Sequence, residues 1–370
     1  MQFIDLQAQY QHLKAQIDRR ISQVLTQGHY ILGPEVSELE SQLADYVGVK
    51  HCITCANGTD ALQLALMAMG IGPGDAVFCP TFTFFASAEV ISLVGATPVF
   101  VDVDPHTYNI CPQDLERRIQ QIQTQGKLSA KAIIAVDLFG LPADYSSLSQ
   151  IAKRHNLRLI EDGAQGFGGK LNGKVACSFG DLATTSFFPA KPLGCYGDGG
   201  ALFTNNNETA ELLRSLRLHG KGQHKYDNVR IGLNSRLDTI QAAVLLEKLT
   251  VFPTELERRN QAAQAYSSVA AKLGFITPHV PEGYYSSWAQ YCLQAEERDK
   301  VMHSLNQAGV PTMIYYQTCM HQQTVYKAQY QAGDFPIAES LAQRIFSLPM
   351  HGYLTEQQLE QITSALQQSS

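Results

Sequence analysis

A lysine between a β-rich run and a glycine-rich turn is the residue of this sequence that could best do covalent chemistry. Lys191 follows the run from Ala183 to Phe188, and four glycines lie between positions 194 and 200. Glycine lets a backbone bend through positive φ or approach another group closely. An amine held at a strand end can condense with an aldehyde, as Schiff-base lysines do. The alternative is a surface lysine in a turn.

A carboxylate and a possible anion site also stand at predicted strand ends. The stretch 157–162 indicates a strand that finishes in Glu161 and Asp162, and Asn57-Gly58-Thr59-Asp60 opens an apolar helix at 61–69. Small and capping residues before a helix leave backbone N–H groups free for a phosphate, although an ordinary N-cap explains them equally well. Phe84, in an aromatic cluster after another strand, could stack on a flat cofactor or belong to the core.

The elements that must position these groups alternate along the chain. Strands are expected at 52–55, 77–80, 97–103, 131–139, 157–162 and 183–188, with helices at 3–25, 34–47, 61–69 and 145–155. This alternation predicts a parallel sheet with both faces covered, where ligands bind at the carboxyl ends of strands. The pattern shifts at Phe252-Pro253, after a helix at 240–249. We therefore expect a large domain at 1–251 and a smaller α+β domain at 252–370, with a helix near 255–273.

Composition narrows the possible partners. The 370 residues carry a net charge of −6, with 45% apolar and 17% charged residues, and no basic block suited to nucleic acid. No apolar run approaches a membrane span and no signal peptide is evident, so we expect a cytoplasmic protein. The eight cysteines lie in apolar runs, as expected for reduced thiols. The spacing Cys52-x-x-Cys55 is compatible with a redox-active pair. It does not indicate a metal site, because no second cysteine pair or histidines follow at ligand spacing.

Taken together, the singled-out groups match the needs of pyridoxal 5′-phosphate (PLP). This cofactor requires a lysine for its aldehyde, a carboxylate that keeps its ring nitrogen protonated, donors for its phosphate and an apolar face for its ring. The chain offers Lys191, Asp162, Gly58-Thr59 with Ser186, and Phe84. Each group alone is a weak signal, but their order and their placement at strand ends favour a PLP site.

Four segments of the sequence carry a more specific signal: Asn57-Gly-Thr-Asp-Ala-Leu62, Glu161-Asp-Gly-Ala-Gln165, Ser186-Phe-Phe-Pro-Ala-Lys191 with Gly197-Asp-Gly-Gly200, and the run 232–243. In these segments, and over essentially its whole length, the sequence resembles the DegT family of PLP-dependent nucleotide-sugar aminotransferases. The resemblance implies an aspartate aminotransferase-like α/β fold, in which a large domain with a mostly parallel mixed sheet is joined to a smaller C-terminal domain.

The resemblance implies a catalytic role for two residues. Lys191 matches the Schiff-base lysine, which also moves the proton during amino transfer, and Asp162 matches the partner of the pyridinium nitrogen. The other cofactor-binding positions are implied in the same way: Gln165 near the phenolic oxygen, Phe84 stacked on the ring, and Gly58, Thr59 and Ser186 around the phosphate.

The resemblance also implies a homodimer with shared active sites, because Asn234 matches an asparagine that reaches the neighbouring subunit's phosphate. Within the family, the sequence is most similar to enzymes that aminate C-3 of a UDP-linked 2-acetamido-3-keto-glucuronic acid from L-glutamate, for O-antigen-type polysaccharides. There, the arginine matching Arg236 meets the sugar carboxylate, which suits a guanidinium fork. A subunit-interface ion pair is the alternative for Arg236. Tyr316 matches a substrate-side motif tyrosine.

Two departures from the family pattern leave other functions open. Gly163 replaces an alanine, so we expect a looser or shifted loop beside the cofactor, and the run Tyr315–Met320 lacks a histidine and two prolines near the substrate entrance. One alternative is amination at C-4 of a dTDP- or UDP-linked deoxy-ketosugar. Another is a weakly active or non-catalytic PLP-fold binding protein. A dinucleotide oxidoreductase is disfavoured, because no G-x-G-x-x-G follows the first strand.

Overall fold

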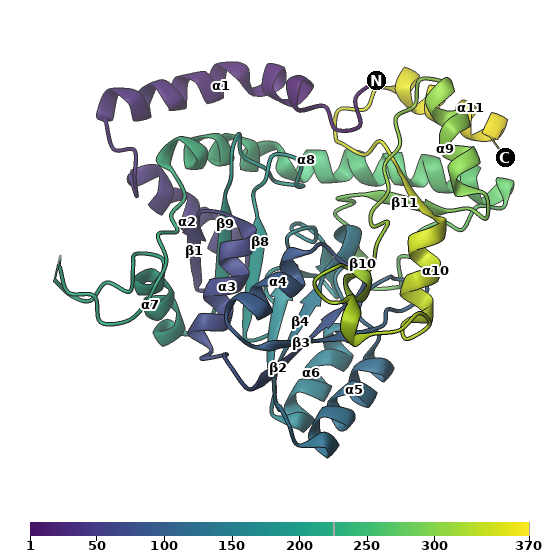
Figure 1. The fold of residues 1–370 in the computed structure, drawn as a ribbon. Coiled ribbons are helices and arrows are strands. Elements are labelled where there is room, and N and C mark those ends of the chain that lie inside the picture. Colours follow the sequence, from purple (N-terminus) through teal and green to yellow (C-terminus); the bar gives the residue numbers. More distant parts are fainter. Residues whose placement is uncertain (225, 370) are drawn as a thin grey trace.

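A seven-stranded sheet forms the centre of the fold, in a computed structural model that describes residues 1–224 and 226–369 (Figure 1). Five neighbouring strands run parallel, and β9 and β1 continue the sheet in antiparallel pairings. The predicted mostly parallel mixed sheet is therefore confirmed. In spatial order the strands are β1 (His51–Cys55), β9 (Gly200–Thr204), β8 (Leu182–Ser186), β5 (Arg158–Asp162), β4 (Ser129–Val136), β2 (Asp75–Pro80) and β3 (Thr97–Val101).

Helices cover both faces of this sheet, as its uninterrupted apolar strands require. Within β4, Ile133 and Ile134 are fully buried but point into different hydrophobic clusters, one on each face. One face carries α3 (Gly58–Ala68), α4 (Ala86–Leu93) and α7 (Asn207–Leu216). The other face carries α2 (Pro34–Val47), α5 (Pro112–Gln125), α6 (Tyr145–His155) and the first half of α8 (Thr239–Ala270).

The long helix α8 corrects one expectation from the sequence. Two helices separated near Phe252-Pro253 were expected, but α8 continues through both residues. Phe252 is fully buried against Phe167, at 5.7 Å between ring centroids. Because the core holds the helix at that point, packing outweighs the hydrogen bond that Pro253 cannot donate. The division into domains at 1–251 and 252–370 stays a prediction, with one helix crossing the proposed boundary.

A smaller α+β layer packs on the second half of α8. Its apolar centre includes the buried side chains of Tyr266, Leu293, Leu305 and Leu366. It contains β11 (Tyr291–Gln294) paired with β12 (Ile345–Leu348), together with α9 (Arg298–Gln307), α10 (Pro336–Arg344) and α11 (Glu356–Ser369). Figure 1 shows α1 (Leu6–Gln27) running alongside α8.

Short elements complete the described chain. A three-stranded sheet joins β10 (Tyr284–Tyr285), β6 (Lys170–Leu171) and β7 (Lys174–Val175). The 3-10 turns are η1 (Leu138–Gly140), η2 (Ala271–Leu273), η3 (Met320–Gln322) and η4 (Lys327–Gln329).

The cysteines are free thiols, and the proposed Cys52-x-x-Cys55 redox pair is not supported. Both side chains are buried, and burial raises the pKa of the Cys55 thiol to about 12. A redox-active cysteine needs an accessible thiolate. Within residues 1–224 and 226–369, no helix is long and apolar enough to cross a bilayer, and no group of three metal-ligating side chains is found.

Candidate active site

A cavity of about 970 Å³ lies where β1, β2, β5 and β8 end and their following loops begin. Its wall also includes the segment from Ile314 to Thr318 of the C-terminal layer. Eight of the predicted site residues line it: Gly58, Thr59, Phe84, Asp162, Gln165, Ser186, Lys191 and Tyr316. The sheet therefore gathers in one place residues that are spread over more than 250 positions of the sequence.

The predicted lysine and carboxylate face this cavity from neighbouring strands. Asp162 is the last residue of β5 and pairs in register with Thr184 of β8, whose strand leads to Lys191. Burial raises the pKa of Asp162, and hydrogen bonds and the Lys191 charge partly oppose this shift. Burial lowers the pKa of Lys191, and the Asp162 charge opposes that shift in turn. Each group thus favours the ionised form of the other.

Ser87, a residue that the sequence reasoning did not single out, orients the carboxylate. Its hydroxyl donates to Asp162 Oδ2 at 2.8 Å, and the backbone N–H of Ala164 donates to Oδ1 at 3.2 Å. Ser87 is buried in the first turn of α4, a helix that was also not predicted. The available signal was a serine at the start of a helix that follows a strand end after the short loop 81–85.

The first turn of α3 forms a backbone cradle beside Lys191. Asn57 caps this helix by accepting the Asp60 N–H at 2.8 Å, and the amides of Gly58 and Thr59 have no earlier carbonyl of the helix to bond. A Cβ on Gly58 would lie 2.7 Å from the Ser186 Cβ, so only glycine permits this close approach. The result is a compact set of N–H and O–H donors at a helix N-terminus, which suits a phosphate.

Aromatic and amide side chains also line the cavity. The Gln165 amide is fixed at both ends, because its Oε1 accepts the Phe139 N–H at 2.7 Å and its Nε2 donates to the Tyr316 hydroxyl at 2.9 Å. Phe84 leaves 54% of its side chain exposed, although large apolar residues usually lie in the core. An aromatic face left open at a cavity is suited to stacking on a planar ring.

The glycine that departs from the family pattern is tightly packed, contrary to the expected looser loop. A Cβ on Gly163 would lie 2.5 Å from Cys177 Sγ. The Gly163 N–H also donates to the Thr184 carbonyl at 2.9 Å, which ties the loop to β8. The thiol of Cys177 therefore takes the space that an alanine methyl would need.

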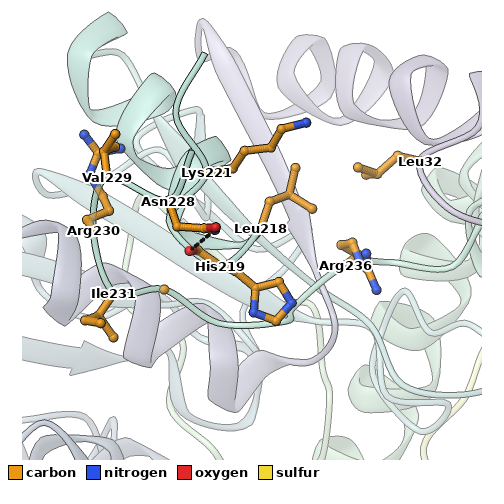
Figure 2. A pocket seen from close by; sticks show the side chains of 10 residues that line it. Leu32, Leu218, His219, Lys221, Asn228, Val229, Arg230, Ile231 and Arg236 are labelled. Atoms are coloured by element: carbon orange, nitrogen blue, oxygen red, sulfur yellow. Dashed lines mark hydrogen bonds between the residues drawn. The ribbon is translucent and has the colours of Figure 1, made fainter. Parts of the chain in front are cut away.

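Asn234 and Arg236 lie away from this cavity. Asn234 is exposed and forms an isolated bridge with Leu218. Arg236 lines a second hollow of about 920 Å³, together with three more basic side chains: His219, Lys221 and Arg230. Figure 2 shows Arg230 and Arg236 on opposite sides of it. Within the described chain, the Arg236 guanidinium has no hydrogen bond or ion pair, so an ion pair within its own subunit does not explain it.

The donor set of the first cavity fits PLP. A primary amine and a buried carboxylate face the cavity from β8 and β5, and the helix cradle can bind a phosphate. Alanine at Gly200 would collide with the Asn57 carbonyl, so the cradle also depends on this second glycine. With a primary amine, a buried carboxylate, an anion cradle and exposed aromatic side chains, the cavity meets the requirements of the cofactor.

Comparison with known proteins decides the family. The sequence profile of the DegT/DnrJ/EryC1/StrS aminotransferase family matches residues 11–367. The chain belongs to this family. UDP-2-acetamido-2-deoxy-3-oxo-D-glucuronate aminotransferase of Pseudomonas aeruginosa is 46% identical over 99% of both chains. UDP-N-acetyl-3-dehydro-alpha-D-glucosamine 3-aminotransferase of Acidithiobacillus ferrooxidans is 41% identical, over 99% of this chain and 97% of the relative.

Solved structures of DegT-family aminotransferases confirm the fold and the cofactor. An aminotransferase of this family from Brucella abortus has a TM-score of 0.97 and 52% identity, covering 100% of this chain and 99% of its own. NtdA of Bacillus subtilis, with bound PMP, has a TM-score of 0.86 and 27% identity, covering 96% and 81%. PMP is the amino form of PLP. This protein is thus a PLP-dependent sugar aminotransferase with an α/β fold.

Proposed function

We propose that this enzyme transfers the amino group of L-glutamate to C-3 of UDP-2-acetamido-2-deoxy-3-oxo-D-glucuronate. The main support for this substrate is the 46% identity, over nearly the whole chain, to an enzyme named as the aminotransferase of this sugar nucleotide. The unpaired guanidinium of Arg236 supports it, because a sugar carboxylate is the partner that such a fork recognises. The products are 2-oxoglutarate and the 3-amino sugar, so the amino group and the keto oxygen exchange places.

Bound PLP supplies an aldehyde for the amine and a ring that accepts electrons. Lys191 then has two tasks: it binds the aldehyde, and its released amine moves the proton between the donor and acceptor carbons. Burial lowers the pKa of this amine, which increases the neutral fraction that can accept a proton. Lys191 and Asp162 are therefore the proposed catalytic residues.

Asp162 has the complementary task of holding a proton on the ring nitrogen. The hydrogen bonds from Ser87 and from the Ala164 N–H favour its ionised form, although burial opposes it. In the proposed site, Gly58, Thr59 and Ser186 bind the phosphate and Phe84 stacks on the ring. Gln165 lies near the phenolic oxygen, and Tyr316 lies on the substrate side.

Asn234 and Arg236 are proposed to serve the active site of a second copy in a homodimer. Both lie outside the cavity that contains Lys191, next to a segment with strongly exposed apolar side chains, such as Ile231 at 88%. Asn234 would meet the cofactor phosphate and Arg236 the sugar carboxylate of the neighbouring subunit. We further propose a cytoplasmic enzyme that supplies amino sugars for surface polysaccharides of the O-antigen type.

Mass spectrometry of the product tests the reaction directly. The protein is incubated with PLP, 15N-labelled L-glutamate and a panel of UDP- and dTDP-linked keto sugars. The 3-oxo-glucuronate should acquire 15N at C-3, whereas Lys191→Ala protein should show no turnover. Amination by that variant, or amination only at C-4 of a deoxy-ketosugar, would contradict the proposal. PLP binding without turnover on any sugar would favour the non-catalytic alternative.

The names of the two relatives suggest two acceptor sugars, the 3-oxo-glucuronate and the 3-oxo-glucosamine, and only the first carries a sugar carboxylate. If Arg236 meets it, Arg236→Leu should lower kcat/KM for the uronate by about tenfold to a hundredfold, since a charge-assisted bond is worth roughly 1.5–3 kcal/mol. Turnover of the 3-oxo-glucosamine analogue, which lacks the carboxylate, should change far less. Arg344→Leu is a matched control, because Arg344 pairs with Glu296 in the C-terminal layer. Equal losses with both sugars would exclude carboxylate recognition by Arg236.

A further inference from the structure

A buried lysine without a carboxylate partner lies beneath the loop that follows Lys191. Lys248 is only 1% exposed on α8 and forms no ion pair within the described chain. Its ammonium donates to the Gly194 carbonyl at 2.7 Å and lies 4.1 Å from the centroid of the Tyr196 ring. Burial lowers its pKa to about 8. A buried cation is costly unless its contacts compensate, so these two contacts call for an explanation.

The Gly194 carbonyl belongs to the turn that presents Lys191 to the cavity. The Cys195 N–H donates to the Phe187 carbonyl at 2.8 Å, which closes a turn with Lys191 in its middle. The segment that leads away from Lys191, residues 192–199, is called the 192–199 loop. The turn is tight at Gly194, where a Cβ would lie 2.6 Å from the Phe188 carbonyl oxygen. The Lys248 ammonium therefore bonds the part of the chain that leads away from Lys191.

A second side chain on the same face of α8 bonds the same loop. Gln241 lies two turns before Lys248, and its Oε1 accepts the Tyr196 N–H at 2.9 Å. From the other side, Tyr10 of α1 packs edge-on against Tyr196, with 6.0 Å between ring centroids. The loop therefore depends on α8 for two hydrogen bonds at Gly194 and Tyr196, and Lys248 makes the charged one.

We propose that Lys248 is a positioning residue, whose ammonium fixes the 192–199 loop and thereby the direction in which Lys191 enters the cavity. Lys248 does not line the cavity and so acts through Lys191 alone. This inference rests on the proposed function only where turnover is measured. Loop mobility and cofactor affinity test it without any substrate.

The test compares Lys248→Met, which keeps most of the apolar stem of the side chain but ends one atom short and cannot donate, with the same change at the exposed Lys300, which pairs with Glu297. In Lys248→Met, hydrogen exchange of peptides covering 192–200 should rise at least about tenfold while exchange in α9 and α11 stays unchanged. The Kd for PLP should rise about tenfold, and kcat should fall about tenfold to a hundredfold with KM nearly constant. Lys300→Met should match wild type in all three measurements.

Lys248→Gln is the second variant, in case Lys248→Met does not fold. Its amide is one bond shorter than the lysine side chain and cannot reach Gly194 without a shift, so loop exchange and PLP affinity should change in the same direction by at least about threefold. Wild-type loop exchange and PLP affinity in the folded variant would overturn the proposal. A uniform rise in exchange over all peptides would also overturn it, since that indicates a purely structural role. If even the wild type fails to aminate the uronate, the two substrate-free measurements still decide on Lys248.

Discussion

The hydroxyl of Ser87 donates to Asp162 Oδ2 at 2.8 Å, although 75 positions separate the two residues. The Ser87 hydroxyl also lies 3.2 Å from the Thr83 hydroxyl, so the carboxylate is bonded to one member of a buried pair of hydroxyl groups. This contact stabilises the charged form of Asp162 against the cost of its burial.

Ser87→Ala should therefore raise the pKa of Asp162. Because the carboxylate must be ionised to hold the ring proton, the acid limb of the kcat/KM profile should move to higher pH by about one to two units, as expected for a bond to a charged group worth roughly 1.5–3 kcal/mol. Ser92→Ala is the control, since Ser92 also lies on α4 but bonds the Tyr326 hydroxyl. An acid limb that stays in place would show that Ser87 does not tune Asp162.

Because Gly163 and Cys177 are in close contact, we predict that substitutions at these two positions have coupled effects on stability. Gly163→Ala should lower the free energy of unfolding by about 1–3 kcal/mol, because a new methyl must displace a buried thiol. Adding Cys177→Ala should recover at least half of this loss. Urea unfolding of the four proteins of the double-mutant cycle measures the coupling, and strictly additive effects would contradict it.

The hydroxyl of Tyr316 is expected to matter through the Gln165 amide. Burial raises the pKa of Tyr316 well above its ordinary value, so the phenol stays neutral at working pH. Tyr316→Phe leaves Gln165 Nε2 without its acceptor, and kcat/KM should fall about fivefold to thirtyfold for a loss of roughly 1–2 kcal/mol. The same change at Tyr326, outside the cavity, should leave kcat/KM within twofold of wild type. Unchanged kinetics in Tyr316→Phe would rule out this role.

Because His351 is buried, we predict that the protein loses stability in mild acid. Burial, assisted by the charge of Arg259, lowers its pKa from 6.5 to about 4, so the unfolded chain binds a proton between these values that the folded chain does not. Above pH 6.5 the imidazole is neutral in both states and costs no stability. As the pH falls below 6.5, the free energy of unfolding decreases, and the decrease due to His351 reaches about 2 kcal/mol at pH 5. Chemical denaturation at pH 7 and pH 5 should show a correspondingly smaller decrease for His351→Asn. His303→Asn, at an exposed position, should retain the full wild-type decrease.

The sequence by itself determined the chemical set and its place at the sheet edge. Lys191 and Gly58 follow strands and Asp162 ends one. Because parallel strands align their carboxyl ends at one edge, local patterns were enough to bring the three residues together. The same residues indicated PLP by their chemistry, and the family motifs that contain them agreed with that cofactor.

Only the tertiary structure decided which side chains support that set. Ser87, Cys177 and Lys248 contact Asp162, Gly163 and Gly194 across 75, 14 and 54 positions, and no local pattern encodes such pairs. The continuity of α8 through Pro253 and the separation of Arg236 from the Lys191 cavity were decided in the same way. The physical reason is that these features depend on burial and on short-range contacts between distant segments, which exist only once the chain has packed.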